Sequence, residues 1–427
     1  MSHPSRVEFR PLPPVVWAIV LSGVGLIIMT GGMTQAKTKA TSAQANDGIP
    51  EPPSGSPAGP LAYSCGVATA QEGGGQQPVF PAGQYPVKLP DVSLLGARND
   101  LPTPYQPGQD WGQLPPGRKW GSTASVTTAP DGTIWVMDRC GNSGSGGTTC
   151  AGASATVSPI FQFDTSGKLL KNFGAGMFVS PHKLTVDQDE NLWVADNGSH
   201  QVFKLSRDGK VLLTLGKKGI AGPDLDEFDA PTEVAVAPNG DIFVGDGHTG
   251  GGTAAGNARI MKFDKYGKFI KTWGRKGMGP GEFDVVHTLA LDSRGRLFVG
   301  DRQNNRIQIF DQDGKFIAQW FQFGRPSGMY IDKGTDTLYV ADSESRDGRT
   351  NTGQFALSRT GYGFNPGTAR GIRIGSAMDG SVKYFIPDPC PYPYPGSSSF
   401  AEGVTVDLEG NVYGADFLMD VRKFAKK

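Results

Sequence analysis

A unit of four short alternating strands recurs along residues 121–427 and constrains the fold more than any other feature of this sequence. Six copies begin near residues 121, 180, 230, 285, 326 and 400, and turns rich in Gly, Asp and Asn separate the strands within each copy. A period of roughly 40 to 55 residues with four strands per unit is typical of a propeller blade. The sequence therefore predicts an all-β, six-bladed β-propeller with four antiparallel strands in each blade.

The last unit is incomplete, and this indicates how the ring closes. Only three strands follow residue 400, at 404–407, 411–415 and 420–424. A propeller avoids open edges best when its first and last blades share strands. We therefore expect residues 81–120, an extended N-terminal segment, to provide the ring-closing strand. Residues 37–80 are rich in Ala, Ser, Gly, Pro and Gln and are expected to form a disordered linker.

Residues 1–36 have the pattern of a signal peptide or a membrane anchor. Arg6 and Arg10 precede an apolar stretch at 15–29, and small residues follow at 34–36. The apolar stretch is about as long as that of a signal peptide and is short for a spanning helix. An uncleaved anchor formed by residues 15–33 remains the alternative. In both cases the remaining chain is expected to be exported, into the periplasm or the extracellular space.

The four cysteines agree with an oxidising compartment. Cys140 and Cys150 flank a stretch rich in Gly, Ser and Thr, where a disulfide would pin an insertion. Cys65 and Cys390 could form a second bridge, but four cysteines allow three connectivities and the sequence does not choose among them.

The charge balance excludes one broad class of partner. The chain has 41 basic and 41 acidic residues and shows no clustered basic face, so no nucleic acid is expected to bind. Contact with a membrane is expected only through the N-terminal segment, and the protein is expected to be a monomer.

One position in the repeat alternates between metal-binding and small side chains. It lies fourteen residues before the Asp that closes the second strand of each unit. Alternate units place a metal-binding residue there: His182, His287 and Glu402. The other units place a small residue there, with one extra turn residue in the last case: Ala124, Thr232 and Ser327. In a closed ring the three metal-binding residues would lie about 120° apart and face the axis.

Two imidazoles and a carboxylate that converge in this way suit Zn²⁺ with an open fourth position. The alternative is that the three side chains only form hydrogen bonds with water and neighbouring loops.

Two further side chains are expected at the same end of the channel. Arg139 directly follows the closing Asp of the first unit, and its guanidinium could bind a carboxylate in bidentate fashion or form a structural salt bridge. His248 lies two residues past Asp246 in a Gly-rich stretch. It could act as a general base or as an additional metal ligand, or it could be an ordinary loop residue.

Several motifs resemble a known family. The sequence Gly-Pro-Gly-Glu-Phe at 279–283, followed by the strand at 301–310, resembles the NHL repeat. The segments 181–205, 231–236 and 286–291 are similar to the lyase domain of the peptidylglycine α-amidating enzyme, and the similarity extends over about 121–427. This resemblance implies a six-bladed propeller with an axial zinc held by three His residues from alternate blades. It also implies an Arg and a Tyr that act on a peptidyl-α-hydroxyglycine, and a structural calcium in the channel.

The resemblance retains three of the family's functional positions: His182 and His287 as zinc ligands, and Arg139 as the catalytic arginine. Three other positions differ. The third His falls on Glu402, the carboxylate that binds calcium falls on Gly403, and the Tyr falls on His248.

The sequence thus predicts an exported, lyase-like propeller that cleaves a carbinolamide-like C–N bond in a small peptide-like substrate. Arg139 and His248 are the predicted catalytic residues, and zinc is the predicted cofactor. Calcium is a second candidate, although Gly403 removes a carboxylate ligand. The alternative is a non-catalytic propeller that binds a protein or a cell-wall glycan in the cell envelope.

Overall fold

The structure is a computed structural model that describes residues 96–142, 149–248, 256–345, 363, 365, 367–388, 401–416 and 420–427. The chain divides into two units, Met1–Ala62 and Tyr63–Lys427, and all described residues belong to the second unit. The predicted signal or anchor and linker lie outside the described residues, as do Cys65, Cys390 and most of residues 343–370, an insertion expected in the fifth blade.

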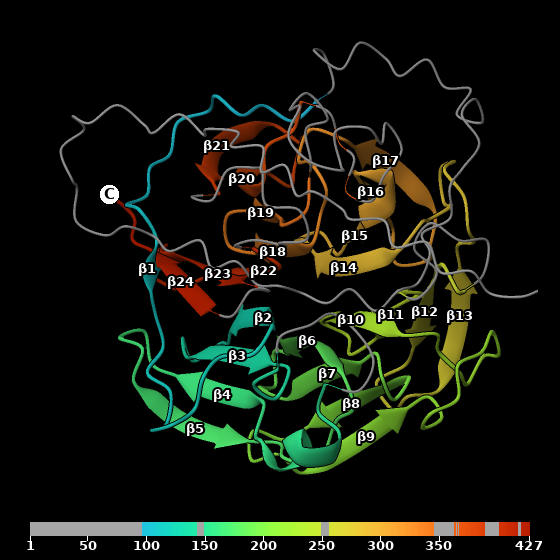
Figure 1. The fold of residues 1–427 in the computed structure, drawn as a ribbon. Coiled ribbons are helices and arrows are strands. Elements are labelled where there is room, and N and C mark those ends of the chain that lie inside the picture. Colours follow the sequence, from blue (N-terminus) through green and yellow to red (C-terminus); the bar gives the residue numbers. More distant parts are fainter. Residues whose placement is uncertain are drawn as a thin grey trace, which may run out of the picture. The chain divides into compact units, whose positions relative to one another are not determined.

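Six four-stranded antiparallel sheets form the ring predicted from the repeat (Figure 1). Blade 1 consists of β2 (Thr123–Thr128), β3 (Ile134–Asp138), β4 (Ile160–Phe163) and β5 (Leu169–Phe173). Blade 2 consists of β6 (Pro181–Val186), β7 (Leu192–Asp196), β8 (Gln201–Leu205) and β9 (Val211–Leu215). Blade 3 consists of β10 (Pro231–Val236), β11 (Ile242–Asp246), β12 (Arg259–Phe263) and β13 (Phe269–Trp273).

The second half of the ring follows the same plan. Blade 4 consists of β14 (Val286–Leu291), β15 (Leu297–Asp301), β16 (Arg306–Phe310) and β17 (Phe316–Trp320). Blade 5 consists of β18 (Gly328–Asp332), β19 (Thr337–Asp342), β20 (Gly371–Ser376) and β21 (Val382–Pro387). Blade 6 consists of β22 (Gly403–Val406), β23 (Val412–Asp416), β24 (Asp420–Phe424) and the N-terminal β1 (Gln109–Asp110). The first strand of each blade contacts the first strand of the next, and β22 contacts β2.

The N-terminal strand closes the ring, as the incomplete last unit predicts. Gln109 pairs with Lys423, and β1 forms the outer edge of the last sheet. Trp111 follows directly and is buried between the first and last blades. Its ring centroid lies 5.2 Å from that of Phe163 in blade 1 and 4.8 Å from that of Tyr413 in blade 6. The closure therefore combines strand pairing with an aromatic wedge.

The hydrophobic core lies between neighbouring blades. The second strand of every blade is buried along almost its whole length, because adjacent sheets cover both of its faces. Trp193, Phe228 and Phe263, for example, pack together between blades 2 and 3. The outermost strands are partly exposed, as in β5 and β13. This gradient places the inner strands, and the side chains at their ends, in the buried centre of the ring.

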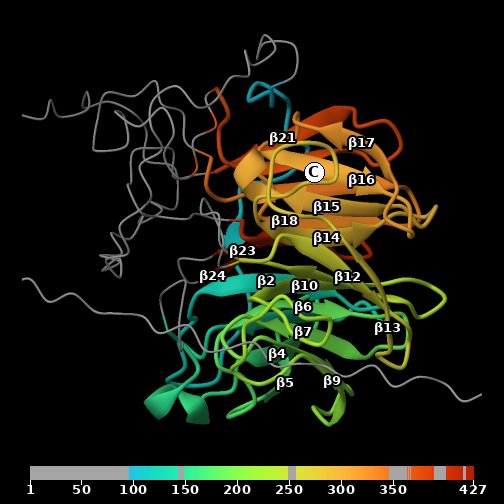
Figure 2. The same ribbon diagram turned by 90° about the vertical axis from the view of Figure 1, so that its right-hand side faces the viewer.

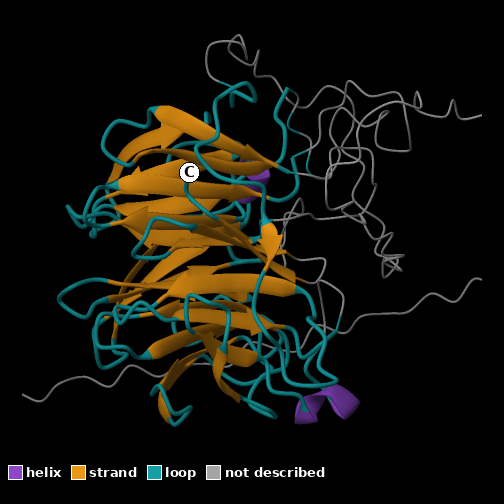
Figure 3. Ribbon diagram, turned by 90° about the vertical axis from the view of Figure 1, so that its left-hand side faces the viewer, coloured by secondary structure: helices purple, strands orange, loops and turns teal. Residues whose placement is uncertain are grey.

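Regular structure outside the strands is sparse (Figures 2 and 3). The described residues contain two short 3-10 helices, η1 (Gly152–Thr156) and η2 (Arg302–Asn304). Within the described part of the chain, no helix is long and apolar enough to cross a membrane. The predicted disulfide between Cys140 and Cys150 is present and lies directly after Arg139.

Candidate metal centre

The two histidines predicted as ligands begin the inner strands of blades 2 and 4. Pro181 pairs with Asp196 and Val286 pairs with Asp301, and the register of both strand pairs shifts at the next residue, which is the histidine. A local shift of this kind re-aims the side chain of the extra residue. His182 and His287 thus leave the regular alternation of the strand.

The closing Asp residues hold the chain that leads into these strands. In blade 2 the carboxylate of Asp196 accepts hydrogen bonds from the N–H groups of Val179 and Ser180 at 2.8 and 2.7 Å. In blade 4, Asp301 accepts a hydrogen bond from the N–H of Asp284 at 2.7 Å. The end of the second strand therefore fixes the entry to the first, which explains why the fourteen-residue spacing is so regular.

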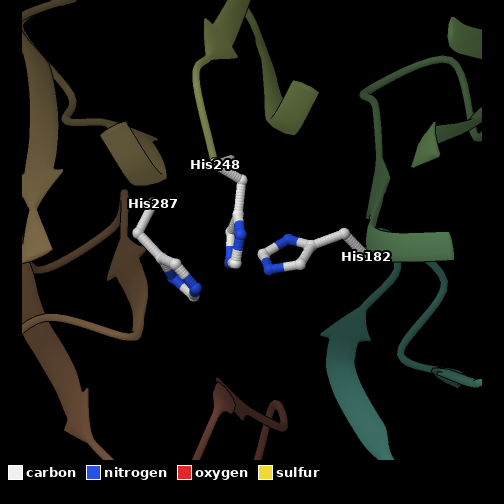
Figure 4. Close-up of side chains that lie close together, drawn as sticks. All are labelled: His182, His248 and His287. Carbon is white, nitrogen blue, oxygen red and sulfur yellow. The ribbon is translucent and has the colours of Figure 1, made fainter. Parts of the chain in front are cut away.

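Three imidazoles converge in the hub (Figure 4). The ring centroids of His182 and His287 are 4.7 Å apart, and His248 lies 4.9 and 5.2 Å from these two rings. One candidate ligand nitrogen from each ring lies within 4.8 Å of the other two. His182 and His287 are buried, and His248 is half-buried. The structure thus brings His248, which follows β11, into the same cluster as the two histidines of the inner strands.

Main-chain carbonyl groups orient two of these rings. His182 Nδ1 lies 2.9 Å from the carbonyl oxygen of Thr232, and His287 Nδ1 lies 2.7 Å from that of Ser327. A carbonyl oxygen only accepts hydrogen bonds, so Nδ1 carries the proton and the lone pair is on Nε2. This is the arrangement in which second-shell groups prepare histidines for metal binding.

Electrostatics keeps the three imidazoles neutral. Burial lowers the pKa of His182 and His287 well below the usual value, and nearby positive groups lower both further. Burial, together with Arg302 and Arg139, lowers the pKa of His248 to about 3. Neutral imidazole is the form that binds metal ions.

Glu402 faces this cluster. Its Oε1 lies 3.1 Å from Nε2 of His287, and its Oε2 accepts a hydrogen bond of 2.6 Å from Ser343 Oγ. Burial alone would raise the pKa of Glu402, but the charges of Arg302 and Lys183 outweigh burial and hold the pKa below its usual value. Glu402 is therefore a carboxylate at neutral pH.

The contact between Glu402 and His287 fits a cation better than a hydrogen bond. Two electron-rich atoms, a carboxylate oxygen and an imidazole lone pair, face each other across 3.1 Å. Among the described residues, Nε2 of His287 is buried without a hydrogen-bond partner. Three imidazole nitrogens that lie within 4.8 Å of one another form a donor set suited to a zinc-type ion, and the Glu402 carboxylate lies beside one of them.

Arg139 reaches the same buried centre. Its Nε donates a hydrogen bond of 3.3 Å to the carbonyl oxygen of Pro181, the residue before His182. Burial lowers the pKa of Arg139 to about 10, while the charge of Glu402 raises it, so the guanidinium remains charged at neutral pH. The structure thus brings together all five predicted site residues: Arg139, His182, His248, His287 and Glu402.

Sequence reasoning missed Arg302 and Ser343. Arg302 is buried, and its guanidinium lies 3.7 Å from Glu402 and 3.4 Å from Glu344. Both missed residues directly follow the closing Asp of their blades, which is the repeat position that Arg139 occupies in blade 1. A comparison of this second repeat position across the units would have identified them.

The comparisons with known proteins agree with this picture. Residues 178–205 and 283–310 match the NHL repeat. Over 141 residues the chain is 42% identical to a probable peptidyl-α-hydroxyglycine α-amidating lyase of Caenorhabditis elegans, which covers 32% of this chain and 38% of the relative. Over 146 residues it is 43% identical to the peptidyl-glycine α-amidating monooxygenase of Mus musculus, which covers 32% of this chain and 14% of the relative. The chain thus spans well under half the length of these relatives.

A solved structure of a gluconolactonase from Xanthomonas campestris aligns with 76% of this chain and 99% of its own, at 15% identity and a TM-score of 0.49. A likeness at this level carries no inference about activity. Together, the NHL repeats, the homology to amidating lyases and the six blades confirm the resemblance to the amidating-lyase propeller.

Proposed function

We propose that the protein is a metal-dependent lyase that cleaves the C–N bond of a peptidyl-α-hydroxyglycine-like substrate. The observation that carries the proposal is the orientation of His182 and His287. Carbonyl groups hold both Nδ1 atoms, and the opposite nitrogen of His287 is buried without a hydrogen bond in the described structure. The similarity to amidating lyases supports the substrate class.

His182, His248 and His287 are the proposed metal ligands, and zinc is the proposed ion. The sequence analysis predicted Glu402 as the third metal ligand and His248 as the residue that transfers the proton. The convergence of the three rings favours the exchange of these two roles. A bound zinc would act as a Lewis acid and lower the pKa of the substrate hydroxyl.

The remaining charged groups bind the substrate and transfer its proton. The Arg139 guanidinium binds the substrate carboxylate in bidentate fashion. The ionised Glu402 accepts the proton of the hydroxyl group. As the C–N bond breaks, its electron pair stays with the nitrogen, which takes the proton from Glu402 and becomes the peptide amide. The carbinol carbon, now doubly bonded to oxygen, leaves as glyoxylate. Arg302, 3.7 Å from Glu402, keeps that carboxylate ionised between turnovers.

We also propose that the protein works outside the cytoplasm, in the periplasm or the extracellular space, as a monomer. The disulfide between Cys140 and Cys150 supports an oxidising compartment. The charged and apolar pattern of residues 1–36 supports export.

A direct assay tests the activity. Zinc-loaded protein is incubated with an N-acyl-α-hydroxyglycine, and glyoxylate and the amide are quantified in parallel. We expect equal amounts of the two products at a rate above that of the metal-stripped protein. Absence of turnover together with absence of bound metal would instead support the non-catalytic propeller that binds a protein or a glycan.

A further inference from the structure

A buried ammonium group lies in the hub beside the candidate metal centre. Lys183 follows His182 on β6, and only 3% of its surface is exposed. Its Nζ donates hydrogen bonds to the carbonyl oxygen of Ala124 at 2.8 Å and to that of Glu402 at 2.5 Å. One side chain from blade 2 therefore ties together the inner edges of blades 1 and 6, where the ring closes.

The oxygen atoms around this ammonium are of the kind that bind hard cations. Main-chain carbonyl groups are common calcium ligands, usually together with carboxylates. The resemblance described above places a calcium-binding carboxylate at the position of Gly403, which shares a peptide unit with the carbonyl that Lys183 binds. The nitrogen of Lys183 thus lies next to the position where the related propellers are expected to hold calcium.

The residues present do not fit a calcium ion. Gly403 offers no carboxylate, and a Cβ atom at this position would lie 3.0 Å from the carbonyl oxygen of Ala124 and 3.1 Å from the nitrogen of Val126. The carbonyl groups of Ala124 and Glu402 already accept hydrogen bonds from Lys183. At this position the chain therefore offers no carboxylate, and its two main-chain carbonyl oxygens already bind the Lys183 ammonium.

A counter-charge lies on the neighbouring blade at the same repeat position. Glu233 follows Thr232 as Lys183 follows His182, and its Oε2 accepts hydrogen bonds from Thr288 Oγ1 at 2.6 Å and from the N–H of Leu289 at 2.9 Å. Both charged side chains line a central cavity of ≈ 460 Å³. Glu233 thus provides a negative charge within electrostatic range of the Lys183 ammonium.

We propose that the Lys183 ammonium takes the place of a calcium ion in the hub, so that the propeller closes around a cation carried by its own chain. The ring then keeps its geometry without calcium. Lys183 also acts as a positioning residue, because its bond to the carbonyl group of Glu402 fixes the backbone of the residue that faces His287. This inference does not depend on the proposed lyase activity.

Calcium dependence of the wild-type protein gives the first test. Full-length protein is dialysed against a calcium chelator or against calcium chloride, and its calcium content and thermal unfolding are measured. We expect no stoichiometric calcium and the same unfolding temperature in both buffers. A bound equivalent of calcium whose removal lowers the unfolding temperature would overturn the proposal.

Replacement of Lys183 gives the second test. Lys183→Met removes the ammonium, leaves two carbonyl groups unpaired and is expected to lower the unfolding temperature by several degrees. Lys171→Met is the matched control, because Lys171 Nζ also donates to a carbonyl group of the next blade, that of Arg207 at 3.1 Å, but its side chain is 37% exposed. The control is expected to unfold close to the wild-type temperature. Equal unfolding temperatures for Lys183→Met and wild type would contradict the proposal.

Chemical rescue identifies the ammonium as the essential group. Lys183→Ala opens a space beside the central cavity, so added ethylammonium is expected to restore stability, whereas tetramethylammonium, which cannot donate hydrogen bonds, is not. Equal effects of the two ions would contradict the assignment. If Lys183→Ala does not fold, Lys183→Arg should fold because it retains a cation, and its failure together with calcium-dependent wild-type unfolding would refute the proposal. None of these readouts uses turnover or zinc.

Discussion

The Nδ1 atom of His287 donates a hydrogen bond of 2.7 Å to the carbonyl oxygen of Ser327, which holds the corresponding repeat position one blade further along the ring. His182 and Thr232 form the same relationship at 2.9 Å. In both pairs the imidazole of one blade thus binds the main chain at the small residue of the next blade.

The first prediction concerns metal binding. Wild-type protein should bind about one equivalent of zinc, and His182→Ala, His248→Ala and His287→Ala should each lose it, because three ligands are the minimum for an open catalytic site. Metal analysis after gel filtration measures the content. His200→Asn is the control, since His200 Nδ1 accepts a hydrogen bond from the N–H of Ala230 and stabilises the backbone. Zinc retained by all three alanine variants would rule out the centre.

The second prediction separates the roles of Glu402 and His248. Glu402→Gln keeps the shape of the side chain but removes the base, so kcat should fall by a factor on the order of 10²–10⁴ while zinc content stays at the wild-type level. Glyoxylate release and metal analysis are measured on the same preparation. Loss of zinc in Glu402→Gln, with retention of zinc in His248→Ala, would instead support the sequence-based assignment, in which Glu402 is the ligand and His248 is the base.

The third prediction concerns the substrate carboxylate. Arg139→Lys retains the charge but loses the bidentate geometry, so kcat/KM should fall by about 10- to 100-fold, as expected for a lost hydrogen bond between charged groups. The matched comparison is a substrate in which an amide replaces the carboxylate. Wild type and variant should process that substrate at similar rates, and a penalty of equal size on both substrates would exclude carboxylate binding by Arg139.

The fourth prediction concerns ring closure. Trp111→Ala should lower the free energy of unfolding by about 3–5 kcal/mol, because it removes a large buried side chain wedged between the first and last blades. Urea unfolding of the full-length protein measures the change. Tyr266→Ala serves as the control because this side chain is 76% exposed and should change stability by no more than about 0.5 kcal/mol. An unchanged stability for Trp111→Ala would mean that β1 closes the ring without the wedge.

Much of the fold and part of the site could be predicted because equivalent positions in a sequence repeat occupy equivalent places in each blade. The period of the strands predicted the blades, and the missing strand in the last unit predicted an N-terminal contribution, which β1 provides. The same regularity identified His182 and His287, because a fixed distance to the closing Asp means a fixed place on the inner strand.

Other contacts of the site could not be predicted from the sequence. Lys183 binds two main-chain carbonyl oxygens, and every residue carries such an oxygen, so the sequence has no signal for the partners. His248 was predicted at the same end of the channel, as a base or an additional ligand, but its exact place beside the two other imidazoles depends on the path of the chain after β11. The position of a residue in the repeat therefore predicts which strand carries its side chain. It does not predict which loop residues contact that side chain.

The pairing of β1 with β24 has a consequence for the order of synthesis. A ribosome produces Gln109–Asp110 long before Asp420–Phe424, so the first half of this pair waits while all the intervening blades are made. Until the final hairpin emerges, the nascent chain is an open arc whose two end blades leave an apolar face uncovered, and exposed apolar surface is prone to join other chains. Ring closure therefore waits until the last strands of blade 6 have been made.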